Sequence, residues 1–201
     1  MNRMARLAVA VAILAIAPVA HSEMIARKTV TYFSIGGKTA ADLDREMAEH
    51  GPLLNTGRRH PGATRVTFAG KASYVAEEGR CSIGEARIVL TTKMMLPRWK
   101  NRSKADARMA LLWDTLSADI KRHEERHAEI ARNHARALEK TLRSLRPEKN
   151  CEALKDKVAL ATAKALEDHD ADQKRFDRIE AVNFSARMTR LLRYRATGRA
   201  E

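Results

Sequence analysis

Two histidines one helical turn apart are the residues of this sequence best suited to chemistry. They are the ends of the run His123-Glu124-Glu125-Arg126-His127. Four residues along a helix give a rise of about 6 Å and a rotation of about 40°, so both imidazoles can reach one ion. His-Glu-x-x-His on a helix is a zinc pattern in which the glutamate acts as base. The run therefore predicts zinc ligands at His123 and His127, with Glu124 accepting a proton from water activated by the metal.

A third zinc ligand must come from another part of the chain. His134 lies on the same face of the helix, but it is about 10 Å further along the axis than His127. We interpret His134 as a histidine that is satisfied in the core or hydrogen-bonded beside the site.

The next helix offers candidates for the third ligand. If the turn before it is centred near residue 148, antiparallel register sets His127 opposite His169, and His123 opposite Asp172 or Gln173. His169 is the first candidate and Asp172 an alternative. The competing interpretation is that residues 168–172 form an exposed acidic patch.

The histidine helix is predicted from about Ser103 to Leu145 by its apolar period. Its stripe contains Met109, Trp113, Leu116, Ile120, His123, His127, Ile130, His134 and Ala137. Imidazoles on a core-facing stripe cost desolvation free energy unless something satisfies them, which favours a bound metal. A second long helix is expected from Glu152 to about Val182.

The residues before this helical hairpin read as a small sheet. Alternating apolar and β-branched residues predict strands at Lys28–Ile35, Thr64–Val75 and Cys81–Met95, with a capped helix at Ala40–His50. The fold class is therefore α+β, with a small antiparallel sheet and one crossing helix packed on the long C-terminal hairpin. We expect a substrate to pair with a sheet edge as an extended strand, and residues 88–95 to form that edge.

The first 22 residues read as a cleavable secretory signal. Arg3 and Arg6 precede an apolar run from Leu7 to Ala17, and small residues stand at the −3 and −1 positions of a cleavage site after Ser22. The competing interpretation is an uncleaved anchor, but the run is shorter than the roughly 20 residues of a membrane span. We expect a domain at 23–183, a basic tail at 184–201, no membrane span in the mature chain, and a periplasmic or secreted location.

Export makes a disulfide between the two cysteines, Cys81 and Cys151, the expected state. Closing a loop of about 70 residues would stabilise the fold by roughly 4 kcal/mol on the chain-entropy model. Two buried free thiols are the alternative.

The formal charge of +13 attracts anionic partners, and an anionic envelope surface is a possible one. Aromatic residues make up only 4% of the chain and are not interleaved with the basic residues. A solvated basic surface is therefore favoured over specific recognition of nucleic acid.

Short motifs that follow one another over roughly residues 30 to 178 match those of a known family. They are Tyr32-Phe33, Gly37-Lys38-Thr39-Ala40-Ala41-Asp42-Leu43, Gly51-Pro52, Gly57-Arg58-Arg59, Thr64-Arg65, Cys81-Ser82-Ile83, Leu96-Pro97-Arg98-Trp99, His123-Glu124-Glu125-Arg126-His127 and Cys151. With these the chain resembles a family of bacterial exported proteins of unknown function that are described as predicted secreted zinc-dependent proteases. The resemblance implies a zincin-like hydrolase with His123 and His127 as ligands and Glu124 as base.

The chain departs from the family pattern near its end. The family has a Tyr-Asp pair followed by Thr-x-His-Gly, whereas here Phe176-Asp177 is followed by residues that place Val182 at the histidine position. If that histidine binds zinc in relatives, this chain has replaced it with His169, Asp172 or Glu180, or has lost the metal.

The function expected from these observations is a secreted zinc metallopeptidase that hydrolyses a peptide bond in a peptide or protein substrate. Two alternatives remain. One is a non-catalytic zincin-like module that binds the envelope, and the other is a polyanion-binding basic protein.

Overall fold

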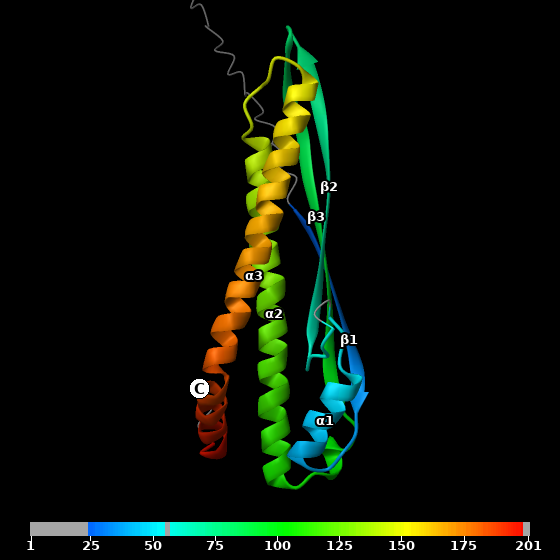
Figure 1. Cartoon of the computed structure of the whole chain (residues 1–201), viewed down its shortest axis with the longest axis vertical. Coiled ribbons are helices and arrows are strands. Elements are labelled where there is room, and N and C mark those ends of the chain that lie inside the picture. Colours follow the sequence, from blue (N-terminus) through cyan, green and yellow to red (C-terminus); the bar gives the residue numbers. More distant parts are fainter. Residues whose placement is uncertain (1–23, 55–56, 199–201) are drawn as a thin grey trace, which may run out of the picture.

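The structure is a computed structural model that describes residues 24–54 and 57–198, so the predicted signal at 1–22 lies outside the described residues. The elements are β1 (Ile25–Ile35), α1 (Ala40–His50), β2 (Ala63–Glu77), β3 (Arg80–Trp99), a 3-10 turn (Arg102–Lys104), α2 (Ala107–Arg143) and α3 (Cys151–Ala196). The sheet runs alongside the two long antiparallel helices, and α1 lies at one end (Figure 1). This confirms the α+β class. In the described part of the chain, no helix has the length and apolar character that crossing a membrane requires.

The strand order is β1-β3-β2, which makes the sheet mixed. β2 pairs antiparallel with β3 through a two-residue turn, in which Glu78 and Gly79 have φ values of 47° and 75°. β1 pairs parallel with β3, so the prediction of a wholly antiparallel sheet is wrong. The cause is that β3, rather than β2, lies beside β1. Residues 88–95 are therefore central, and the prediction that they form an edge is also wrong.

Alternation along β3 turns one face of the sheet toward the helices. The buried residues on this face of β3 include Ala86, Ile88, Leu90, Thr92, Met94 and Leu96. The apolar residues among them divide between two core clusters. One joins Ile88 and Leu90 to Ala131, Ala135, Leu138 and Leu142 of α2, and the other joins Met94 and Leu96 to Leu43, Trp113 and Ile120. Between Ile120 and Ala131 the buried residues of α2 are Glu124 and Ala128, whereas His123 and His127 are only half-buried and contact α3.

α3 continues well past the expected end near Val182. It is helical to Ala196, so most of the segment predicted as a basic tail belongs to this helix. Two contacts explain the extension, because Met188 is buried and Arg187 binds Asp119 of α2.

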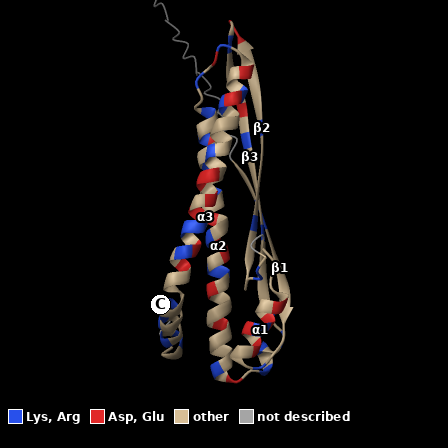
Figure 2. Ribbon diagram, in the orientation of Figure 1, with Lys and Arg blue, Asp and Glu red and all other residues tan. Residues whose placement is uncertain are grey.

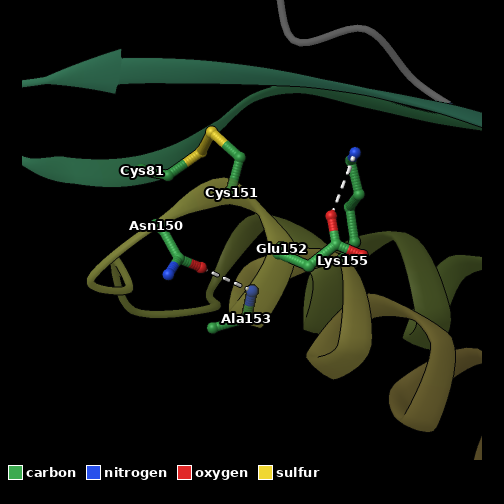
Figure 3. The surroundings of a disulfide bond; sticks show 6 residues. All are labelled: Cys81, Asn150, Cys151, Glu152, Ala153 and Lys155. Atoms are coloured by element: carbon green, nitrogen blue, oxygen red, sulfur yellow. Dashed lines mark hydrogen bonds and ion pairs between the residues drawn. A yellow bond between two sulfur atoms is a disulfide. The ribbon is translucent and has the colours of Figure 1, made fainter.

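The predicted disulfide is present between Cys81 at the start of β3 and Cys151 at the start of α3 (Figure 3). The main chains of Cys81 and Glu148 also exchange two hydrogen bonds of 2.8 Å. Next to the disulfide, the Asn150 side chain accepts from the backbone N–H of Ala153 and caps α3. The turn of the helical hairpin is thus tied to the sheet.

Candidate metal centre

Three ligand atoms from the two long helices converge on one point. Nε2 of His123 and Nε2 of His127 lie 3.0 Å apart. Oδ1 of Asp177 on α3 lies 3.0 Å from Nε2 of His127 and 3.3 Å from Nε2 of His123. The two imidazoles therefore face α3, where a carboxylate meets them.

The spacing of these atoms fits a zinc ion. Ligand atoms at 2.0–2.1 Å from a tetrahedral ion are about 3.3 Å from one another. The three observed separations, 3.0, 3.0 and 3.3 Å, differ from this by at most a few tenths of an ångström. Two imidazoles and a carboxylate also form a donor set found in catalytic zinc sites, which keep a fourth position for water or substrate.

Hydrogen bonds orient the His127 ring for this role. Gln173 donates through Nε2 to the main-chain oxygen of His127 at 3.1 Å, which directs Oε1 of Gln173 to Nδ1 of the same residue. Nδ1 of His127 therefore carries the proton that Gln173 accepts. In the neutral ring, Nε2 is left with its lone pair toward Asp177.

The charges in the centre favour binding a cation. Burial disfavours the ionised carboxyl of Asp177, but hydrogen bonds from His123 and His127 outweigh it and lower the pKa of Asp177. Burial also opposes protonation of His127, yet the hydrogen bonds with Asp177 and Gln173 raise its pKa.

His123 has contacts of its own to α3. The Phe176 ring stacks on its imidazole, with ring centres 4.9 Å apart. Oε2 of Glu180 lies 3.6 Å from Nδ1 of His123, on the side of the ring away from the ligand atoms. Glu180 also pairs with Arg122 and, at 3.1 Å, with Arg187. Glu180 therefore holds the back of the ring and does not join the cluster.

Glu124 faces the sheet, where it is only 5% exposed. Oγ1 of Thr64, on β2, donates to Oε2 of Glu124 at 2.9 Å and also to its main-chain oxygen at 3.0 Å. Gly62 gives the carboxylate space, because a Cβ atom at that position would lie 3.0 Å from Oε1. Burial raises the pKa of Glu124, and the Thr64 hydrogen bond offsets part of this.

The ligands and Glu124 border one pocket of about 650 Å³. It lies between the beginning of β2, α2 and the second half of α3. Its apolar lining comes from Leu54, Val66, Ile120, Ala181 and Phe184. A pocket of this size, largely apolar with a few convergent polar groups, is typical of ligand-binding sites.

The predicted residues divide into those that the structure brings together and those that it separates. His123, Glu124, His127 and His169 border one pocket, but neither His169 nor Asp172 belongs to the three-ligand cluster. Nε2 of His169 accepts from Gln173 at 2.9 Å. Asp172 binds His134 at 3.0 Å, which agrees with the interpretation of His134 as a satisfied histidine.

Asp177 is the candidate ligand that the sequence argument missed. The hairpin turns just before Cys151, so Gln173 lies opposite His127, and Asp177 opposite His123. The predicted register was one helical turn too early. The one available signal was the Phe176-Asp177 pair, which stands at the Tyr-Asp position of the resembled family.

Comparison with known proteins places this site within a family. Residues 30–184 match the family described as bacterial protein of unknown function (DUF922). The matched range contains every residue of the candidate centre. No curated protein and no solved structure matches the chain.

Proposed function

The chain belongs to this bacterial family, DUF922, and we propose that it is an exported zinc-dependent peptidase. One observation carries the proposal. The donor atoms of His123, His127 and Asp177 lie within 3.3 Å of one another, and the buried carboxyl of Glu124 borders the same pocket. A metal site beside a base with a raised pKa is the arrangement that metal-assisted hydrolysis requires.

Different residues of the site would bind the metal and transfer the proton during peptide hydrolysis. Zinc held by His123, His127 and Asp177 would polarise the peptide carbonyl and make water more acidic. Glu124 takes the proton from the attacking water and delivers it to the leaving nitrogen. The raised pKa of Glu124 suits a group that must both gain and lose this proton. Thr64 holds the carboxylate through Oε2 and leaves Oε1 for the proton.

The edge of β2 supports binding of an extended peptide. β2 is an edge strand, and Ala63, Thr64 and Val66 at its beginning line the pocket. A substrate strand paired with this edge would run past the metal ligands. The edge of β2 thus takes the place of residues 88–95 as the proposed site of pairing with a substrate strand. The apolar wall that includes Ile120 and Phe184 suits a large apolar side chain beside the bond to be cleaved.

Two features support export to the periplasm or beyond. Residues 1–22 have the composition of a signal peptide. The disulfide between Cys81 and Cys151 is of a kind that persists in oxidising compartments.

Metal content and activity of the mature protein test the proposal together. We expect about one zinc per chain, lost in His123→Ala, and cleavage of a fluorescence-quenched peptide library by the zinc-loaded protein. Glu124→Gln is the matched variant, because it should keep zinc and lose cleavage. Absence of zinc after loading at several pH values would instead support a non-catalytic binding module.

A second function, binding to an anionic surface, is favoured by the end of α3. Residues 181–198 contain four arginines and no acidic residue, and Lys and Arg gather at this end of the helix (Figure 2). Arg187 forms an ion pair with Asp119, whereas Arg190 and Arg193 are exposed. Reversing both exposed charges, with Arg190→Glu and Arg193→Glu, should abolish binding to vesicles that contain anionic phospholipid and leave zinc content unchanged. Equal vesicle binding by this variant and the wild type would exclude this function.

A further inference from the structure

A hydrogen-bonded chain of side chains on α3 leads to one of the metal ligands. Nδ1 of His169 lies 3.1 Å from Oδ1 of Asp170, which can only accept, so Nδ1 carries the proton of the neutral ring. Nε2 of His169 is then an acceptor, and it lies 2.9 Å from the amide nitrogen of Gln173. Because Nε2 of His169 accepts, the donor and acceptor in each following hydrogen bond, from Gln173 to His127, are also determined.

The Gln173 amide has one orientation that satisfies all its neighbours. Its NH₂ group donates to Nε2 of His169 and to the main-chain oxygen of His127. Its oxygen therefore faces Nδ1 of His127 and accepts the proton there. Rotating the amide by 180° would set its oxygen against two acceptors and its NH₂ group against Nδ1–H, so that three hydrogen bonds would be lost together.

We propose that Gln173, held in one orientation by His169, imposes on His127 the tautomer whose Nε2 is free to bind a metal. Gln173 and His169 are thus positioning residues for the centre. The inference rests on the proposed function only in taking His127 as a metal ligand.

Burial makes this orientation effective. His169 is 7% exposed, and its ring packs nearly perpendicular to that of Phe68 on β2 with ring centres 5.0 Å apart. The half-buried side chain of Gln173, on α3, hydrogen-bonds to His127 of α2 and to His169 of α3. Partners that hydrogen-bond to the far nitrogen of a ligand histidine fix its tautomer, and losing them typically costs about 10- to 100-fold in metal affinity.

Zinc affinity, measured by competition with a chelator, is the first test. Gln173→Leu removes the acceptor at similar length and should weaken zinc binding by about 10- to 100-fold. Gln173→Glu keeps an acceptor for Nδ1–H, but its second oxygen faces Nε2 of His169 and the main-chain oxygen of His127, so it should recover only part of the affinity. His169→Phe keeps the aromatic packing and should lose about tenfold, and His169→Asn, which restores an acceptor, should recover part of it.

His134→Phe is the matched control. His134 is a half-buried histidine on the same hairpin, and its ring packs on His169. Its hydrogen bond goes to Asp172, which is not part of the hydrogen-bonded series from His169 through Gln173 to His127. The His134→Phe variant should therefore keep the zinc affinity of the wild type. The proposal fails if Gln173→Leu binds zinc as tightly as the wild type, or if His134→Phe weakens binding as much as His169→Phe.

The tautomer of His127 provides a readout that does not depend on peptidase activity. Long-range ¹H–¹⁵N NMR correlations should show the proton on Nδ1 in the zinc-loaded wild type and a mixture of tautomers in metal-free Gln173→Leu above the pKa of the ring. A proton on Nε2 in the neutral, metal-free wild type would overturn the inference. A protein that binds zinc, shows Nδ1–H and cleaves no peptide would refute the proposed function and leave this inference intact.

Discussion

Nε2 of His127 and Oδ1 of Asp177 lie 3.0 Å apart across the helical hairpin. When Gln173 accepts the Nδ1 proton, both of these atoms are acceptors, so a cation must lie between them. A proton on His127 gives an ion pair, and a divalent metal gives the zinc site. Zinc binding should therefore release a proton from this pair.

Replacing Asp177 tests its role as the third ligand. Asp177→Asn preserves the volume but removes the charge, and we expect zinc affinity to fall by more than the 10- to 100-fold typical of residues one step removed from a metal. Isothermal titration with zinc measures this change. Asp172→Asn is the control, because Asp172 binds His134 outside the three-ligand cluster, and its affinity should equal that of the wild type. Equal affinity in Asp177→Asn would eliminate this residue as a ligand.

Parts of the site whose residues are close together in the sequence were predictable, and parts whose residues come from distant segments were not. The His123 and His127 pair is four residues apart on one helix, so helical period alone brings its imidazoles together. Asp177 depends on where the hairpin turns, and a shift of two residues in that turn moves the facing residue by about one helical turn. Thr64 and Gly62, which surround Glu124, depend on packing of the sheet against α2 and carry no local signal.

Gly62 gives a test of the position of Glu124 that leaves the ligands alone. A Cβ atom at this position would lie 2.9 Å from Cγ2 of Ile120 and 3.0 Å from Oε1 of Glu124. Gly62→Ala should displace the carboxylate and lower kcat by about 100-fold, the cost of a misplacement near 1 Å, while zinc affinity stays unchanged. Steady-state kinetics and zinc titration measure the two quantities.

Gly70→Ala is the matched control for this experiment. Gly70 lies on β2, the strand that Gly62 directly precedes, and a Cβ atom there would lie 3.0 Å from Cδ1 of Ile88, the end of a flexible side chain, and 3.3 Å from the main-chain oxygen of Arg87. This variant should keep the wild-type kcat. A Gly62→Ala protein with full activity would show that the observed position of Glu124 does not matter for catalysis.

Asp119 joins α2 to the extended part of α3 and should contribute to stability in a pH-dependent way. It is 5% exposed and accepts from Arg187 at 2.9 and 3.1 Å and from Arg122 at 3.0 Å. Burial opposes its ionisation, but these hydrogen bonds prevail and lower the pKa of Asp119. Because the folded-state pKa is depressed, the stabilisation is present above the unfolded pKa near 4 and is lost as pH falls through the folded value.

Denaturant unfolding of Asp119→Asn measures this contribution. At pH 7 we expect the free energy of unfolding to fall by about 2–3 kcal/mol, as for buried hydrogen bonds to charged groups. The difference from the wild type should shrink below pH 4. Asp114→Asn is the control, because Asp114 pairs with Arg102 on the surface and should contribute at most about 1 kcal/mol. A difference that grows as the pH falls would contradict the assignment.

The fold was predictable where the hydrophobic period is long and unbroken. The alternation along β3 and the apolar period of α2 predicted where each of these elements begins and ends to within a few residues. Strand order has no such signature, so the parallel pairing of β1 with β3 could not be deduced. α3 passes its expected end because the charge pair of Arg187 with Asp119 holds it to α2, an interaction that apolar period does not reveal.

The disulfide should stabilise the domain without forming part of the site. Replacing both Cys81 and Cys151 with serine removes the cross-link from the unfolded chain, which for a loop of about 70 residues costs roughly 4 kcal/mol of unfolding free energy. Thermal unfolding should then occur roughly 10 °C lower for a chain of this size. The bridge lies at the hairpin turn, away from the residues that line the site pocket, so the folded variant should still bind one zinc with wild-type affinity. Loss of zinc binding by a variant whose circular dichroism shows it to be folded would mean that the bridge also sets the register of α2 against α3.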